Sequence, residues 1–168
     1  MTVIITMRKE IVISQPEDVV FHFISNGSND PKWRTEVYRM DVSGPPCVGT
    51  EWTEYSKFFK FIKVVILAVV KEFNPPNRIV IETPSDHPAL LRNIRETKSH
   101  GMKSTLLSYE LEFERIFLRQ LSPIIPPASL IKRFYLPRIS KYLNNAKRLL
   151  ESGQMIQNQH NKGGSDWI

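Results

Sequence analysis

Cysteine is almost absent from this chain of 168 residues, which contains only Cys47. A single cysteine excludes an internal disulfide framework and a cysteine-based zinc cluster, and it fits a reducing compartment better than a secreted one. Long apolar runs are missing too, and the first residues do not follow the pattern of a signal peptide. These absences predict a cytoplasmic protein without redox chemistry.

The motifs of common cofactor and nucleophile chemistry are also missing. The sequence has no glycine-rich phosphate loop, no dinucleotide fingerprint and no nucleophile elbow. It has four histidines, and no two of them have the spacing of metal ligands. We therefore expect neither a cofactor nor a metal site.

Acidic residues are absent from residues 115–150, where eight of the 23 Lys and Arg residues lie. The rest of the chain is slightly acidic, because it holds all 17 Asp and Glu residues, so the net charge of +6 belongs to this segment. One side of a predicted helix within it carries Arg138, Lys141, Lys147 and Arg148.

This basic helix face has three interpretations: a solvated surface, which is the default, contact with an anionic membrane or an acidic partner, and contact with nucleic acid. An apolar run over residues 118–125 supports the membrane alternative. Nucleic acid is disfavoured as a partner, because the aromatic residues lie on the opposite, core side and no nucleic-acid motif is present.

Periodicity divides the chain into many strands and one long helix. Residues 3–14 alternate as a strand, and two short helices follow, the second beginning near Asp30. From residue 36 the pattern predicts strand after strand, including a hairpin that turns at 74–77 and an amphipathic strand over 104–114. We expect one helix over Ala128–Glu151, with a kink or break at Pro137, and then a disordered tail over 152–168.

Four segments carry a family resemblance: ISQPEDVV at 13–20, DPKW at 30–33, GPPCVGTEW at 44–52 and KEFNPPNR at 71–78. With the order of elements, they resemble the helix-grip fold of the START-like (SRPBCC) superfamily, and in particular its polyketide cyclase/dehydrase-like branch. The resemblance covers residues 3–151. One departure is the basic turn around Gly101, where such proteins often have a tight Gly-Gly-Thr-like turn.

The resemblance implies an α+β domain over residues 1–151, in which about six or seven antiparallel strands wrap around the long C-terminal helix. It also implies an apolar cavity between sheet and helix, where a hydrophobic or aromatic small molecule such as a lipid or polyketide would bind. The residues agree with this, because a sheet with one apolar face and one amphipathic helix must bury those surfaces against each other.

Eight aromatic or apolar residues are candidates for the cavity wall, because strand or helix periodicity directs them inward. They are Tyr38, Met40, Trp52, Leu107, Tyr109, Phe113, Phe134 and Tyr142. Plain core packing is the competing interpretation for each of them. The tyrosines are the most informative, because a buried phenol needs a hydrogen-bond partner that a ligand can supply.

The alternative hypothesis is an enzyme of the polyketide cyclase or dehydrase type acting in the same cavity. Its candidate catalytic residues are Glu54, Arg92 and Tyr109. A charged group held inside an apolar cavity supplies acid–base chemistry for a ketone or enol. The competing interpretation is that a single bulge in the strand turns Glu54 or Arg92 to solvent. The sequence leaves open whether a reaction is catalysed, which ligand is bound, and whether the protein is a monomer or a dimer.

Overall fold

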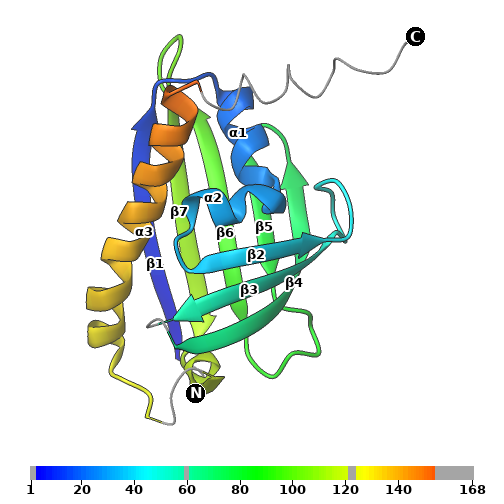
Figure 1. Ribbon diagram of the computed structural model, residues 1–168, viewed down its shortest axis with the longest axis vertical. Coiled ribbons are helices and arrows are strands. Elements are labelled where there is room, and N and C mark those ends of the chain that lie inside the picture. The colour runs from blue at the N-terminus through cyan, green and yellow to red at the C-terminus, as the bar shows by residue number, and fades with distance from the viewer. Residues whose placement is uncertain (1–2, 59–60, 121–123, 154–168) are drawn as a thin grey trace.

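Seven antiparallel strands form one curved sheet in the computed structural model, which describes residues 3–58, 61–120 and 124–153 (Figure 1). The strands are β1 (Ile4–Ile13), β2 (Val37–Val42), β3 (Glu51–Phe58), β4 (Ile62–Asn74), β5 (Arg78–Glu82), β6 (Leu91–Ser99) and β7 (Thr105–Glu114). Their order across the sheet is β1-β7-β6-β5-β4-β3-β2, so β1 and β2 are its edges.

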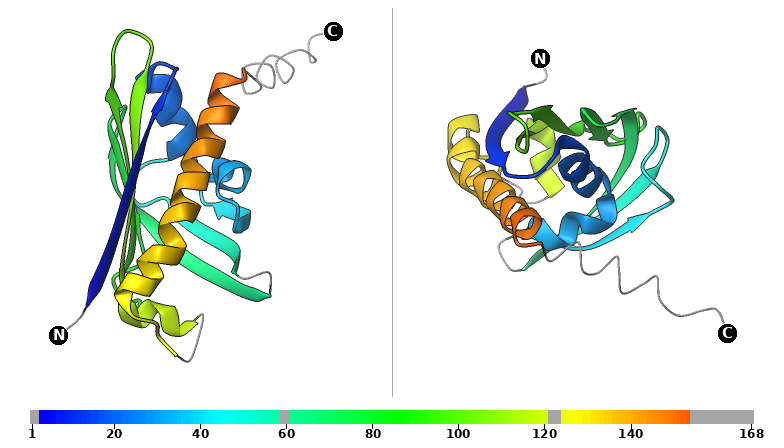
Figure 2. Two further views of the ribbon diagram at one scale, coloured as in Figure 1. Left: turned by 90° about the vertical axis from the view of Figure 1, so that its left-hand side faces the viewer. Right: turned by 90° about the horizontal axis from the view of Figure 1, so that it is seen from above.

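The helices gather on the concave side of this sheet (Figure 2). They are α1 (Glu17–Ser25), the 3₁₀ turn η1 (Gly27–Asn29), α2 (Asp30–Trp33), the 3₁₀ turn η2 (Arg115–Gln120) and α3 (Ala128–Glu151). The predicted α+β helix-grip fold is therefore confirmed, and α3 is one helix that contains Pro137. Residues 154–168, most of the predicted tail, lie outside the described residues. Within the described ranges, no helix is both long and apolar enough to span a bilayer.

Strand alternation gives the sheet one apolar face and one charged face. On β1 and β7, Ile5, Met7, Leu107 and Tyr109 point into the core and are almost completely buried. The outer face carries ion pairs between neighbouring strands, for example Arg8 with Glu96 and Glu110 and Arg92 with Glu82. Long charged side chains cover apolar surface with their stems. Ile94 lies on the outer face of β6 between Arg92 and Glu96. It is buried there because the side chains of these ion-paired neighbours cover it.

The C-terminal end of α3 is tied to the end of β1 by polar contacts. The Lys147 ammonium donates to the Val12 carbonyl at 2.6 Å, and the Ser14 amide donates to the Glu151 carboxylate at 2.7 Å. Gln15 adds a hydrogen bond from its side-chain amide to the Leu150 carbonyl at 3.0 Å. The buried residues of this half of the helix, Leu143 and Ala146 among them, complete the anchor.

Gly27 lies where η1 passes close to β3. A Cβ atom at this position would lie 2.9 Å from the Trp52 ring and 3.0 Å from a methyl group of Val42, both closer than ordinary contacts. Glycine is therefore required here by close packing, since its lack of a side chain makes room for the indole.

We predict that Gly27→Ala lowers the free energy of unfolding by about 1–3 kcal/mol, because the new methyl group overpacks the site beside Trp52. Urea denaturation followed by circular dichroism measures this loss. Gly44→Ala is the matched control, because no atom lies within 4 Å of the Cβ it would add. Equal destabilisation by both variants would contradict the steric explanation.

Candidate functional site

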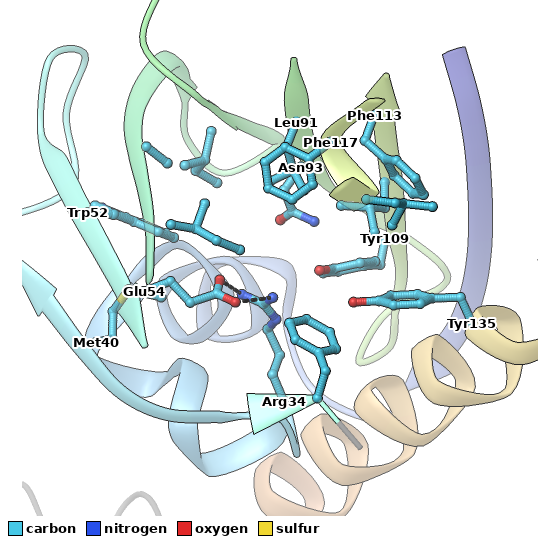
Figure 3. Close-up of a pocket in the computed structure, with 16 residues that line it drawn as sticks. Arg34, Met40, Trp52, Glu54, Leu91, Asn93, Tyr109, Phe113, Phe117 and Tyr135 are labelled. Atoms are coloured by element: carbon cyan, nitrogen blue, oxygen red, sulfur yellow. Dashed lines mark hydrogen bonds and ion pairs between the residues drawn. The ribbon is translucent and has the colours of Figure 1, made fainter. Parts of the chain in front are cut away.

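A pocket lies between the concave face of the sheet and α3 (Figure 3). Its wall is mostly apolar, and its lining residues are Arg34, Met40, Trp52, Glu54, Phe58, Ile66, Ala68, Ile81, Leu91, Asn93, Tyr109, Leu111, Phe113, Phe117, Leu118 and Tyr135. The empty space inside the lining, including the part that is open to solvent, has a volume of about 700 Å³. The cavity proper, into which a water molecule fits, has a volume of only about 50 Å³. The wall thus encloses a narrow cavity that opens to solvent.

An ion pair between Arg34 and Glu54 forms the polar part of the wall. Arg34 follows α2 directly, and its guanidinium binds both oxygens of the Glu54 carboxylate on β3, at 2.6 and 3.1 Å. The Ser56 hydroxyl donates to the same carboxylate at 2.5 Å. Burial opposes the charge on Arg34, but attraction to Glu54 and Asp30 outweighs it, so the pKa of Arg34 lies well above its ordinary value. Arg34 is therefore a permanent cation in the pocket wall.

Behind this pair, Arg95 and Asp30 form a second ion pair that is sealed from water. Their exposed side-chain fractions are 1% and 0%. The guanidinium of Arg95 binds the two Asp30 oxygens at 2.8 and 2.6 Å, and Arg34 binds Asp30 at 2.9 Å. The four charges therefore alternate in sign along one connected row, which begins on β6 and ends at Glu54 in the pocket.

Aromatic rings enclose the guanidinium of Arg95 on several sides. Its central carbon lies 5.0 Å from the ring centroid of Trp33, 5.2 Å from that of Trp52 and 6.0 Å from that of Tyr109. Further hydrogen bonds run from Arg95 to the Asn93 side chain and to the Ile24 carbonyl. Cation–π attraction and these acceptors compensate for the loss of water around the charge.

Two phenol groups point into the pocket from the same side of it, Tyr109 from β7 and Tyr135 from α3 (Figure 3). Burial raises the pKa of both phenols, so that both remain protonated hydrogen-bond donors at neutral pH. Neither hydroxyl is hydrogen-bonded to any residue in the described part of the chain. The cavity thus combines an apolar wall, one bidentate ion pair and two donors that still need acceptors.

The structure places four of the eight predicted wall residues in the pocket lining: Met40, Trp52, Tyr109 and Phe113. Leu107 and Tyr142 are buried in the adjacent core, where Tyr142 donates a hydrogen bond to Glu36. The role of these residues in ligand binding remains a prediction.

The predicted inward orientation of Tyr38 and Phe134 is wrong, because their exposed fractions are 46% and 61%. A register shift between Val37 and Arg39 makes Tyr38 the extra residue of a bulge, so Val37 is buried in its place. On α3, the neighbour of Phe134 is the residue that faces the pocket, namely Tyr135. One helical position corresponds to a rotation of about 100° around the axis.

Glu54 faces inward as expected, but the expectation for Arg92 is wrong. Arg92 lies on the outer face of the sheet, where it pairs with Glu82 at 2.8 Å and Glu112 at 3.2 Å. The inward positions of β6 are instead Asn93 and Arg95, which are buried. In the sequence, Ile94 indicates that its own face of the strand points to the core. Ile94 is instead buried on the outer face under ion pairs, so Arg92 on that face was assigned to the inside.

The basic helix face is less available than the sequence suggested. Arg138 pairs with Glu36 at 3.2 Å, and Lys147 pairs with Glu151 at 3.3 Å. Lys141 and Arg148 are exposed.

Sequence reasoning missed Asp30, Arg34, Asn93, Arg95 and Tyr135 as residues of the site or its support. The sequence indicates Asp30 only as the start of a short helix and as part of the DPKW segment. Its partner Arg95 lies 65 positions away along the chain, so no local pattern connects them. The strand period of two was an available signal for Asn93 and Arg95. It places them on the same face of β6 as Leu91 and Thr97, and this face points inward.

Among the described residues, no three or more His, Cys, Asp or Glu side chains are arranged to hold a metal ion. No protein-family model matches the sequence. No curated protein matches it either.

Solved structures do match. A START superfamily protein from Mycobacterium smegmatis superposes with a TM-score of 0.71 and 12% identity, over 88% of this chain and 98% of that one. The chain has the START-like helix-grip fold. The Zhui aromatase/cyclase from Streptomyces sp. R1128 shares this START-like fold with a TM-score of 0.72 and 9% identity, over 89% and 95% of the two chains. Norcoclaurine synthase from Thalictrum flavum gives a TM-score of 0.60 and 11% identity, over 92% and 98%.

We predict that Asp30→Ala lowers the free energy of unfolding by about 3–5 kcal/mol, because it leaves the buried Arg95 without its carboxylate. Chemical denaturation of the two proteins measures the difference. The matched control is Asp41→Ala, which removes an exposed ion pair with Arg39 and should change stability little. Stability of Asp30→Ala equal to that of the control would show that the buried pair is not needed for folding.

Proposed function

We propose that this protein binds a hydrophobic or aromatic small molecule that carries a hydrogen-bond acceptor, such as a carbonyl or hydroxyl oxygen. The observation behind this proposal is the pair of unpartnered phenol donors, Tyr109 and Tyr135, in an otherwise apolar pocket. Sites of this composition bind by burial of apolar surface and use a few polar groups to fix orientation. The START-like neighbours, which include an aromatase/cyclase, support this class of ligand.

Apolar burial supplies most of the affinity in this proposal. Covering roughly 250 Å² of apolar ligand surface contributes about 6 kcal/mol at 25 cal/mol per Å². A hydrogen bond from each tyrosine adds about 1 kcal/mol. The row of alternating charges carries no net charge, so it favours a neutral, polarised group over an ion.

The present width of the cavity requires the wall to move when the ligand enters. Space of about 50 Å³ for water centres holds a few waters at most, whereas small-molecule sites usually measure about 300–1,000 Å³. Leu118 on η2 and Tyr135 on α3 are only half-buried, and both line the pocket. Outward rotation of these two side chains widens the cavity without disturbing the buried ion pairs.

We predict that Ala68→Phe weakens binding of N-phenyl-1-naphthylamine, a neutral aromatic fluorescent probe, at least tenfold, because the added ring fills the cavity beside Trp52. Fluorescence titration gives the affinity, and circular dichroism verifies the fold. Val65→Phe is the matched control on the outer face of the same strand. Unchanged affinity in Ala68→Phe, or an equal loss in the control, would place the probe elsewhere and reject the proposal.

A cyclase- or dehydrase-type enzyme is the second candidate function, and the inward position of Glu54 favours it. In such a reaction the Glu54 carboxylate takes a proton from the carbon next to a ligand carbonyl, while the phenols stabilise the enolate oxygen. Two observations weaken this candidate. Arg34 and Ser56 already occupy the Glu54 oxygens, and Arg92 lies outside the pocket.

Proton exchange tests this candidate directly. If Glu54 acts as a base, the protein accelerates exchange of deuterium from D₂O into the carbon next to the carbonyl of 2-tetralone, and Glu54→Gln abolishes the acceleration. Proton NMR follows the exchange. Equal rates with both proteins, combined with retained probe binding, would leave ligand binding without turnover as the function.

A further inference from the structure

Exposed apolar side chains gather at the end of the molecule where the pocket opens. Phe61, between β3 and β4, is 88% exposed, and Phe134 and Leu130 are exposed on the first turns of α3. Ile116 on η2 is exposed as well. We call Phe61, Ile116, Leu130 and Phe134 the mouth rim. Exposed aromatic and aliphatic side chains that cluster in this way mark an interaction surface.

The lining of the pocket brings the three segments of the mouth rim together. Phe58 at the end of β3, Phe117 on η2 and Tyr135 on α3 all line the cavity. The rings of Phe58 and Tyr135 lie 6.4 Å apart across it. Figures 1 and 2 likewise place the β3–β4 end, η2 and the start of α3 at the same end of the molecule. The residues of the mouth rim therefore come from three segments that lie at one end of the molecule.

Cations accompany the apolar residues of the mouth rim. Lys63 follows Phe61 closely on β4, Lys132 and Arg133 precede Phe134 on α3, and Arg119 is exposed on η2. None of these four side chains forms an ion pair with a residue in the described ranges. Two carboxylates lie in neighbouring segments, exposed Asp86 and half-buried Glu114, and Glu114 is engaged by the Leu90 amide. The rim consequently has a positive charge.

We propose that the mouth rim docks on an anionic lipid bilayer, with Phe61 and Phe134 in the interfacial layer and the four cations at the phosphates. A protein surface that combines apolar side chains with Lys and Arg binds anionic bilayers in two ways at once. The apolar side chains are buried in the interfacial layer, and the cations are attracted to the anionic headgroups. This location differs from the basic helix face expected from sequence, where Arg138 and Lys147 are engaged in ion pairs within the protein.

Docking at the rim has a consequence that depends on the proposed function: the pocket opens toward the bilayer, so that an apolar ligand passes between membrane and cavity without crossing water. Docking itself does not require an occupied pocket. The two proposals therefore fail in different ways. Ala68→Phe, which fills the cavity, should bind vesicles like the wild type.

Co-sedimentation of the full chain with vesicles tests the docking surface. We expect binding to vesicles of phosphatidylcholine with 30% phosphatidylserine, little binding to phosphatidylcholine alone, and release by 0.5 M NaCl. Lys132→Glu/Arg133→Glu should weaken binding at least tenfold, because each cation near such a surface contributes about fivefold. Phe61→Ser/Phe134→Ser should weaken it at least tenfold through lost burial.

Two matched controls make this test specific. Lys141→Glu/Arg148→Glu reverses the same number of charges in the C-terminal half of α3, and Met102→Ser removes an apolar side chain that is 99% exposed on the β6–β7 turn. Both should bind like the wild type. A loss in Lys141→Glu/Arg148→Glu as large as that in Lys132→Glu/Arg133→Glu would assign docking to the basic helix face and overturn the proposal. Absence of wild-type binding would also overturn it.

Tryptophan quenching provides a readout that does not depend on loss of binding. Phe61→Trp should become quenched by lipids brominated near the headgroup end of their chains, whereas Met102→Trp should retain the quenching level of the wild type. Equal quenching of the two variants would show that the β3–β4 end does not enter the bilayer. Such a result would reject the proposal even if all variants sediment with vesicles.

Discussion

The buried ion pair between Arg95 and Asp30 connects the sheet to the short helices, and the polar part of the pocket depends on it. Neither charge is tolerable in the interior alone, because an unpaired buried ion costs several kcal/mol. Asp30 therefore fixes the position of α2 over β6, and Arg34 is placed one residue after α2 as a result. Glu54 on β3 then completes the neutral row. The buried charges that hold α2 to the sheet thus also place Arg34 and Glu54 in the pocket wall.

Periodicity predicted the architecture well because the sheet and α3 each bury one continuous apolar face. The regular strand β7 illustrates this: Leu107, Tyr109 and Phe113 all face inward as expected. The wrong orientations occurred where a local event breaks the period. The bulge at Tyr38 reverses the alternation of β2, and a difference of one position on α3 separates exposed Phe134 from Tyr135 in the wall.

The charged residues of the site were beyond sequence reasoning for a different reason. In the sequence, a buried arginine cannot be distinguished from a surface arginine until its carboxylate is located, and Asp30 lies 65 positions from Arg95 along the chain. Glu54 was identified because it shares a strand face with Trp52. Its partner Arg34 was not, since it lies in an irregular segment between α2 and β2 without periodicity. Long-range pairing of charges must therefore be obtained from coordinates.

The asymmetric attachment of α3 makes this helix a lever. Its last turn is anchored to β1 through Lys147 and Glu151, whereas its first turns contribute mainly Ile131 and Tyr135 to the interior. Tyr135 lies about 24 Å along the axis from Glu151 at a rise of 1.5 Å per residue, so a tilt of about 10° at the anchor displaces it by roughly 4 Å. That distance is about the thickness of an aromatic ring. For the proposed ligand, contacts at the anchored end of α3 therefore bear on the width of the pocket, although they lie far from it.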